Sequence, residues 1–343
     1  MVAPKYLVIG SGSMAFFAYM GRMSMIDLTH VKGVSGASAG ALLAFLWVVF
    51  DGKIPEMLDF SLKVPLGQIM KPNLKNFFNN FGLVAVGRIK KFVSEILFKK
   101  FKVHDMTFGE LRNRRPVDLH VSAFCVERSE TTYFSHETHP GVSVVDAVCA
   151  SIAVPFLFSP VKIDEWRYID GAVQESLPGL PFVTRHPDEV LALRFETNVS
   201  NSRMGHMFSG VMRLRHTYKY PTYFIRGESI DMFDFGADRL GIFIAGQKSS
   251  RLVNEASHPF GQPRRGDGVL LPPQAGVYSR TWSAQEGHVD FLRVPPSRDQ
   301  DEPSQGAQQG DNQGQAGAPV RVSPSPGYQH IDQTDPPPRF PHL

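Results

Sequence analysis

Apolar runs separated by small and polar residues predict a regular series of short strands and helices from residue 5 onward. Lys5–Ile9 is a compact apolar run and predicts a buried strand, followed by a loop at Gly10–Ser13. A helix is expected from residue 14 to about 24, and a short strand near Val31–Val34. The ten residues from Ala41 to Phe50 are all apolar and predict a buried helix.

The same reading extends the predicted elements to about residue 255. Further helices are expected over Ile54–Lys63, Val144–Ser151, 205–219 and 237–253, and further strands over Val117–Phe124, Thr131–Phe134, Tyr168–Ile169 and Val190–Phe195. Residues 64–87 are rich in Asn, Phe and Gly, and we expect them to be mostly irregular. No internal repeat is visible.

Residues 88–102 predict an amphipathic basic helix. Its apolar stripe is formed by Ile89, Phe92, Val93, Ile96 and Leu97, and its basic residues are Arg88, Lys90, Lys91, Lys99, Lys100 and Lys102. The basic face either lies on an anionic membrane or is the solvated face of a helix that packs on the core, and we favour the second interpretation. Phe77, Phe78 and Phe81, just upstream, are either an interfacial wedge or core residues.

Composition separates two regions, residues 1–255 and residues 256–343. The chain has 343 residues, 42% of them hydrophobic, which is enough for one substantial core. Residues 256–343 contain 14 of the 26 prolines, no lysine, and Gln/Gly runs. Such a segment cannot bury enough apolar surface to offset its ordering entropy, so we predict a disordered tail. The sequence does not identify protein partners of this tail.

Charge, cysteine content and hydropathy exclude several classes of protein. The net charge of +3 is weak and no recognised module accompanies the basic residues, so nucleic-acid binding is not supported. Cys125 and Cys149 lie in apolar surroundings and are expected to be buried, reduced thiols of an intracellular protein. The longest apolar run covers about half a membrane span, and Gly10–Ser13 interrupts the only segment that resembles a signal peptide. We therefore expect an intracellular, cytoplasmic protein that can associate peripherally with membranes.

Residues 36–40 read Gly-Ala-Ser-Ala-Gly and match the G-x-S-x-G nucleophile elbow. In that motif a serine sits on a strained turn between a strand and a helix, and its neighbours must be small to avoid steric clashes. Here Gly36, Ala37, Ala39 and Gly40 surround Ser38. The predicted helix that follows directs its free N–H groups towards the site, where negative charge would develop.

A nucleophilic serine needs a base, and two kinds are available. In α/β-hydrolases the base is a histidine, but in that fold several strands precede the elbow, whereas only two precede it here. The downstream histidines His206, His216, His258 and His288 have no motif around them. The alternative base is a carboxylate, and Asp170 stands where a predicted strand ends, before Gly171 and Ala172.

Four segments, in this order, give the chain a resemblance to the patatin-like phospholipases. They are Gly10-Ser11-Gly12-Ser13, the elbow at Gly36–Gly40, the string Ala150-Ser151-Ile152-Ala153-Val154-Pro155-Phe156-Leu157-Phe158-Ser159-Pro160-Val161, and Asp170-Gly171-Ala172. The resemblance covers about residues 5–255. It implies a three-layer α/β/α domain with a central, mostly parallel sheet.

The resemblance also implies a mechanism. By analogy with the family, Ser38 is a nucleophile that forms an acyl-enzyme, Asp170 is its base, and no histidine, metal or other cofactor takes part. The loop formed by Gly10, Ser11, Gly12 and Ser13 supplies the oxyanion hole, with Gly12 and Ser13 as the expected donors. The substrate would be an ester of a phospholipid or neutral lipid in a membrane or lipid aggregate.

One departure from the family pattern leaves a second interpretation open. The family loop usually reads G-G-G-x-[RK]-G, whereas residues 11–16 here read Ser-Gly-Ser-Met-Ala-Phe. The alternative is a catalytically silent module with the same fold that binds lipid or protein. The distance between the Ser38 hydroxyl and the Asp170 carboxylate distinguishes the two interpretations, because a base must lie within hydrogen-bond reach of its proton.

Overall fold

The computed structural model describes residues 3–196, 220–226, 234–248 and 250–254. The predicted helix 205–219 and the predicted tail 256–343 lie outside these ranges. The strands are β1 Tyr6–Ile9, β2 Gly33–Ala37, β3 Gly82–Val84, β4 Asp118–Cys125, β5 Glu130–Phe134, β6 Phe156–Phe158, β7 Val161–Ile163, β8 Trp166–Asp170, β9 Val190–Glu196, β10 Pro221–Arg226 and β11 Ser250–Asn254. The helices are α1 Ala15–Met23, α2 Ala39–Val49, α3 Ile54–Leu62, α4 Leu66–Ile69, α5 Leu74–Asn80, α6 Val86–Phe101, α7 Phe108–Arg114, α8 Val144–Ser151 and α10 Arg239–Lys248.

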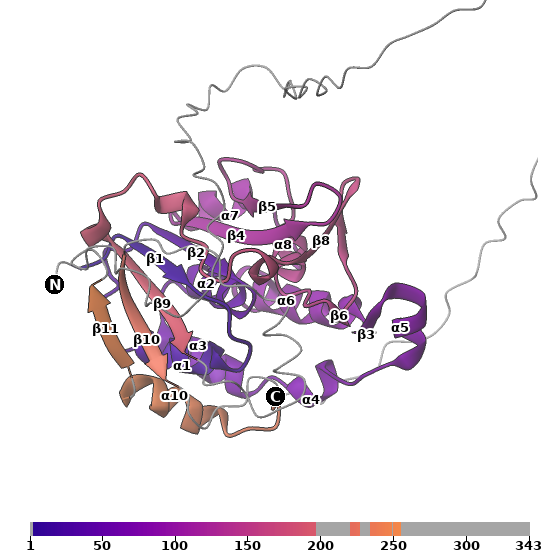
Figure 1. The fold of residues 1–343 in the computed structure, drawn as a ribbon, viewed down its shortest axis with the longest axis horizontal. Helices are drawn as coiled ribbons and strands as arrows, with labels where there is room; N and C mark the ends of the chain where they lie inside the picture. The colour runs from indigo at the N-terminus through magenta and orange to yellow at the C-terminus, as the bar shows by residue number, and fades with distance from the viewer. Residues whose placement is uncertain (1–2, 197–219, 227–233, 249, 255–343) are drawn as a thin grey trace, which may run out of the picture. The chain divides into compact units, whose positions relative to one another are not determined.

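A nine-stranded sheet forms the centre of the fold (Figure 1). Its order is β11-β10-β9-β1-β2-β4-β8-β7, and β5 also pairs with β4. The five strands from β10 to β4 are all parallel, while β11, β5, β8 and β7 pair antiparallel. The expected mixed α/β fold with a mostly parallel central sheet is therefore confirmed.

Strand β4 aligns two other strands end to end along one of its edges. β2 pairs with the first part of β4, up to the match of Ala37 with Ser122. β8 pairs with the last part, where Asp170 is opposite Ala123. Because β5 overlaps both segments of β4, it must occupy the other edge. β2 runs parallel and β8 antiparallel to β4, so the carboxyl ends of β2 and β8 meet head-on.

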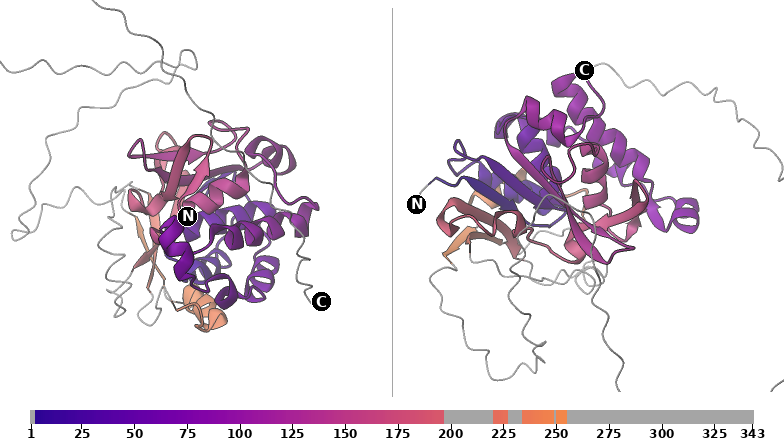
Figure 2. Two further views of the ribbon diagram at one scale, coloured as in Figure 1. Left: turned by 90° about the vertical axis from the view of Figure 1, so that its right-hand side faces the viewer. Right: turned by 90° about the horizontal axis from the view of Figure 1, so that it is seen from above.

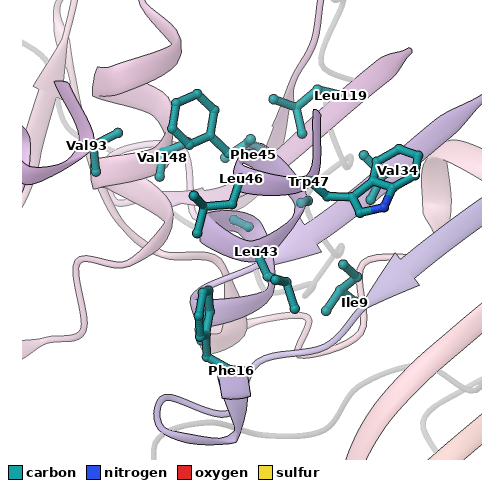
Figure 3. Packing of buried hydrophobic residues seen from close by; sticks show 14 of the residues in the cluster. Ile9, Phe16, Val34, Leu43, Phe45, Leu46, Trp47, Val93, Leu119 and Val148 are labelled. Atoms are coloured by element: carbon teal, nitrogen blue, oxygen red, sulfur yellow. The ribbon is translucent and has the colours of Figure 1, made fainter. Parts of the chain in front are cut away.

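The principal hydrophobic core lies between one face of the sheet and the helices. Alternate residues of β1 point to opposite faces, as the strand period requires: Leu7 and Ile9 join the principal core, while Tyr6 and Val8 join a smaller cluster on the other face. Figure 3 shows α2 at the centre of the principal core, with Leu43, Phe45, Leu46 and Trp47 packed among side chains of strands and other helices. The smaller cluster is completed by Leu177, Phe182, Val190, Ala192 and Tyr220.

Two glycines allow α1 and α10 to pack closely, as Figure 1 illustrates. A Cβ atom at Gly21 would lie 2.0 Å from the Phe243 carbonyl oxygen, and one at Gly246 would lie 2.0 Å from the Ala18 carbonyl oxygen. Since real side chains never approach a backbone atom so closely, this helix pair depends on the absence of side chains at both positions.

Two predictions about secondary structure were wrong. Residues 64–87 contain α4, α5 and β3 instead of being mostly irregular, because Asn73 caps α5 through its side chain and β3 pairs with β6. The helix expected over 237–253 ends at Lys248, and β11 follows because its backbone pairs with the edge strand β10. This long-range pairing overrides the local helical pattern.

The basic helix α6 packs on the core by its apolar stripe, as we favoured. Ile89, Val93, Ile96 and Leu97 are buried, and Phe92 is half-buried. Lys90 forms an ion pair with Asp146, and Lys100 forms one with Glu56. Cys125 and Cys149 are free thiols and buried, as predicted. Within the described ranges, no helix combines the length and the apolar character that a membrane crossing needs.

Candidate active site

The turn between β2 and α2 holds Ser38 in a strained conformation. Ser38 has φ 56° and ψ −126°, a combination that side-chain-bearing residues rarely adopt. Its small neighbours are required, since a Cβ atom at Gly36 would lie 2.3 Å from the Gly40 carbonyl oxygen. A Cβ atom at Gly40 would lie 2.3 Å from the carbonyl oxygen of Ile9. The G-x-S-x-G spacing therefore allows the turn to fit against β1 and the start of α2.

The Ser38 hydroxyl donates a hydrogen bond of 2.6 Å to Oδ2 of Asp170. The other carboxylate oxygen, Oδ1, accepts the backbone N–H of Ala172 at 2.8 Å. Gly171 permits this turn, because a Cβ atom there would lie 2.3 Å from the Ser122 carbonyl oxygen. The head-on meeting of β2 and β8 along β4 thus joins two residues that are 132 positions apart in the sequence.

The environment of Asp170 favours the protonated carboxyl. Its side chain is completely buried, and the loss of solvation raises its pKa to about 7. The hydrogen bonds from Ser38 and from the Ala172 backbone oppose this rise without cancelling it. A carboxylate with a pKa near neutrality can accept a proton and return it, which is the property that a general base requires.

In the loop of residues 10–13, the backbone N–H groups divide into two kinds. Those of Gly10 and Ser11 donate to the carbonyl oxygens of Leu193 and Ser176, at 2.9 and 2.8 Å. In the described part of the chain, the N–H groups of Gly12 and Ser13 make no hydrogen bond. These are the two N–H groups that the family resemblance implied as oxyanion donors, and that role stays a prediction. Ser13 has φ 42°, a conformation that glycine adopts at lower cost.

Sequence analysis did not identify the role of Ser151, which follows from the structure. Its side chain is completely buried at the end of α8, and its hydroxyl accepts the backbone N–H of Ser38 at 3.0 Å. This bond satisfies the polar backbone of the strained turn, which would otherwise be buried without a partner. Ser151 belongs to the string that carried the family resemblance, but its partner is 113 residues away, and only the fold reveals it.

Tyr19 was also missed, and its hydroxyl links the loop to the sheet. The hydroxyl donates to the Ser11 carbonyl oxygen at 2.7 Å and accepts the Phe195 N–H at 3.0 Å. The side chain is completely buried, and burial raises the pKa of the phenol above its usual value. No sequence signal identifies this residue, which lies within an apolar stretch of α1.

Next to Ser38 lies a cavity of about 140 Å³ lined almost entirely by apolar side chains. Its polar lining residues are Ser13, Ser38 and Ser61, while Leu42, Phe92, Leu157 and Phe158 are among the apolar residues of its walls. The walls come from α1, α2, α4, α6 and β6, so they combine segments from distant parts of the chain. An apolar cavity that reaches a nucleophile suits a hydrocarbon group better than a polar one.

The four candidate histidines that have no motif around them, His206, His216, His258 and His288, lie outside the described residues. Of the histidines that are described, His120 is buried on β4, and desolvation lowers its pKa to about 4. Within the described ranges, no three His, Cys, Asp or Glu side chains gather as a metal site would require.

Comparison with known sequences identifies the family. The sequence model of the patatin-like phospholipases matches residues 7–183, just over half of the chain, and this match includes most of β1, the elbow and the Asp-Gly-Ala turn. The chain therefore belongs to the patatin-like phospholipase family.

Individual relatives are more distant. A protein of invertebrate iridescent virus 6, named probable lipid hydrolase 463L, is 26% identical over 185 residues, which are 51% of this chain and 63% of the relative. The uncharacterized protein R571 of Acanthamoeba polyphaga mimivirus is 22% identical over 182 residues, covering 51% of this chain and 60% of the relative. The chain thus spans less than two thirds of these curated relatives. Among solved structures, VipD from Legionella pneumophila matches with 14% identity and a TM-score of 0.49, over 72% of this chain and 66% of VipD.

Proposed function

We propose that this protein is a serine-dependent lipid acyl hydrolase that cleaves carboxylic ester bonds of phospholipids or neutral lipids. The observation that carries the proposal is the 2.6 Å hydrogen bond from Ser38, which lines an apolar cavity, to the buried Asp170. Membership of the patatin-like phospholipase family and the name of the iridescent virus relative support the same class of activity.

In the proposed reaction, Asp170 accepts the hydroxyl proton of Ser38 as the serine oxygen attacks the ester carbonyl carbon. The resulting tetrahedral intermediate collapses to an acyl-enzyme, and the alcohol leaves with the proton from Asp170. Water then attacks the acyl-enzyme while Asp170 again accepts a proton. The second tetrahedral intermediate collapses, the serine oxygen leaves with that proton from Asp170, and the fatty acid is released with Ser38 and the Asp170 carboxylate restored. The raised pKa of Asp170, about 7, supports both directions of proton transfer near neutral pH.

The negative charge on the carbonyl oxygen needs donors, and three backbone N–H groups are candidates. We assign this role to Gly12 and Ser13, whose N–H groups make no hydrogen bond within the described residues. Ala39, the first residue of α2, adds a third N–H at the positive end of the helix dipole. Gly10 and Ser11 hold the loop in place through their bonds to Leu193 and Ser176.

The test of this proposal is covalent labelling combined with lipolysis. Purified wild-type protein should react with a fluorophosphonate probe at Ser38 and should release fatty acid from micellar or vesicle substrates. Ser38→Ala should lose both properties. Ser24→Ala is the matched control, because the Ser24 hydroxyl is outside the cavity; it donates to the Gly21 carbonyl oxygen and accepts the Gln247 side-chain amide at 3.0 Å. A wild-type protein that remains unlabelled and inert on both kinds of substrate would favour a silent binding module.

Tyr19→Phe should slow hydrolysis by weakening the support of the loop that carries the donors. The substitution leaves the Ser11 carbonyl and the Phe195 N–H without their buried partner, which costs about 1–3 kcal/mol of stability. We expect kcat to fall while KM changes little, since the loop acts mainly on the transition state.

The control for this variant is Tyr6→Phe on β1. The Tyr6 hydroxyl makes no hydrogen bond within the described residues, so its removal should leave both kcat and stability nearly unchanged. Equal effects of the two variants on kcat would contradict the role assigned to Tyr19. Steady-state kinetics on a soluble short-chain ester and thermal unfolding measure the two quantities.

A further inference from the structure

Large apolar side chains stand exposed together on α5 and the adjoining strand β6. Leu74, Phe78 and Phe81 are 69, 77 and 72% exposed, and Phe156 at the start of β6 is 53% exposed. Figures 1 and 2 show α5 at the periphery of the described fold, away from the central sheet. We call these four residues the α5 tip. Scattered single apolar residues are normal on a protein surface, whereas a contiguous group of exposed large apolar residues marks an interaction surface.

The spacing of these residues places them on one side of α5. Leu74, Phe78 and Phe81 occupy positions i, i+4 and i+7, which share one helix face. Phe81 ends the helix in the left-handed conformation, with φ 55°. The next residue, Gly82, pairs with Phe156 in the ribbon of β3 and β6, which brings Phe156 beside the end of the helix.

The opposite side of α5 is fixed to the protein, so the exposed face is held in a defined orientation. The Asn76 side-chain amide donates to the Gly82 carbonyl oxygen and, at 3.3 Å, to the Ser159 hydroxyl. Asn73 caps the helix by accepting the Asn76 N–H. Phe156, the first residue of β6, also has φ 67°, which is an unfavourable conformation for an aromatic residue.

The sequence on either side of α5 carries charge of one sign. No acidic residue occurs between Asp59 and Glu95, whereas this interval contains Lys63, Lys71, Lys75, Arg88, Lys90 and Lys91. Lys71 and Lys75 flank the apolar face, are exposed, and have no ion pair within the described residues. The Arg88 guanidinium donates to the Lys71 carbonyl oxygen and thus lies beside the same segment. An apolar face surrounded by cations complements an anionic lipid surface.

The α5 tip is continuous with the cavity at Ser38. On β6, Phe156 is exposed, whereas the next two residues, Leu157 and Phe158, are buried and line the cavity. Ile69 and Met70, shortly before α5, also line it. A bilayer in contact with the α5 tip would therefore lie next to walls that lead to the nucleophile.

We propose that the α5 tip, together with Lys71 and Lys75, is the docking surface by which the protein binds anionic lipid bilayers. Insertion of the aromatic side chains supplies apolar contact, and the lysines add attraction to acidic headgroups. The inference rests on the proposed lipid hydrolase function, because docking serves to deliver lipid to Ser38. The inference also assigns the membrane contact to α5 instead of the basic face of α6, which was the alternative raised by the sequence.

Docking and chemistry can be tested separately. Binding is measured by sedimentation of the full chain, in a Ser38→Ala background, with phosphatidylcholine vesicles and with mixed phosphatidylcholine–phosphatidylserine vesicles. Hydrolysis of a soluble short-chain ester is measured with the same surface substitutions in proteins that keep Ser38. If the wild-type protein does not hydrolyse the soluble ester, the proposed function is contradicted. The vesicle-binding result does not depend on that activity.

The double variant Phe78→Ser/Phe81→Ser should weaken binding to the mixed vesicles by at least about tenfold, because each buried aromatic side chain contributes to the affinity. Its soluble-ester activity and thermal unfolding should match those of the parent, since both residues are exposed. The matched control is Leu180→Ser/Val183→Ser, two exposed apolar residues at 50 and 54% in a different segment. The control should retain vesicle binding.

Lys71→Gln/Lys75→Gln should lower affinity for mixed vesicles by about tenfold or more, as each basic residue near an anionic surface contributes about 1 kcal/mol. Binding to pure phosphatidylcholine vesicles should be unchanged, and added salt should remove the difference between the two proteins. The proposal fails if Phe78→Ser/Phe81→Ser binds mixed vesicles as the parent does, or if the Leu180/Val183 control loses as much. A parent protein that binds neither kind of vesicle would also overturn it and would favour a protein partner.

Discussion

Asp170→Asn is expected to abolish ester hydrolysis and to stabilise the fold at neutral pH. Asparagine keeps the size of the side chain, and its oxygen can still accept the Ala172 N–H. It cannot accept the Ser38 proton, so the proposed acyl transfer loses its base. Removal of one member of a catalytic unit typically lowers kcat by about 10⁴-fold or more. In the wild type, kcat/KM should rise as pH increases through about 7, because Asp170 must lose its proton to act as the base.

The gain in stability follows from the raised pKa of Asp170. The folded protein holds this proton up to about pH 7, whereas the unfolded chain releases it near the ordinary value of 3.8. Because the folded state binds more protons in this window, the free energy of unfolding falls as pH rises from about 4 to 7. Above pH 7 the full cost applies, a few kcal/mol at about 1.4 kcal/mol for each pKa unit. Asp170→Asn avoids this cost, so its advantage over the wild type should be present at pH 8 and absent near pH 4.

Denaturant unfolding at several pH values measures this difference. Asp164→Asn is the matched control, because Asp164 is an exposed turn residue and its replacement removes one carboxylate without touching the site. The control should keep both the activity and the pH dependence of the wild type. An Asp170→Asn protein with wild-type stability at pH 8 would show that the carboxyl is not desolvated as the structure indicates.

Gly40→Ala is expected to destabilise the protein by more than about 3 kcal/mol, which places it among the most damaging single substitutions. The added Cβ atom would lie 2.3 Å from the Ile9 carbonyl oxygen and 2.5 Å from the Gly10 carbonyl oxygen. Both are backbone atoms of β1 and of the loop after it, so no flexible side chain can move aside. Relief of the clash has to displace α2 or the loop that carries the Gly12 and Ser13 donors, and hydrolysis should be lost as well.

Gly87→Ala provides the contrast, because a Cβ atom at Gly87 in α6 would meet nothing within 4 Å. Alanine is favoured over glycine in a helix, so this variant should be more stable by up to about 1 kcal/mol. Denaturant unfolding of both variants, with the soluble-ester assay, tests the pair. If Gly40→Ala unfolds at the wild-type midpoint, the close contact of α2 with β1 is not a constraint on the fold.

The principal residues of the site were accessible from sequence because their local chemistry is unusual. A serine between small residues, after one apolar run and before another, has few structural explanations, and Asp170-Gly171 after a short strand supplied a carboxylate at a turn. Ser151 and Tyr19 were not accessible, since a serine at the end of a helix and a tyrosine within an apolar helix are ordinary. Their roles depend on partners that are far away in the sequence.

The same division applies to the fold. Buried elements such as α2 and β9 were predicted because continuous apolar runs are a local signal. The residues of α5, β3 and β11 were misjudged because capping, ribbon pairing and an edge partner stabilise these elements. Local composition there is polar or mixed and does not indicate which distant strand will pair.

By itself, the sequence determined the family, the expectation of a mostly parallel α/β fold, and the pairing of a serine with a carboxylate as the candidate chemistry. Those conclusions rest on residue types and their order along the chain. Only the tertiary structure decided that Ser38 and Asp170 are in contact, because β4 holds β2 and β8 end to end, and that Asp170 is desolvated. Distances between strand ends and the loss of solvent depend on how the chain packs, and no local pattern encodes them.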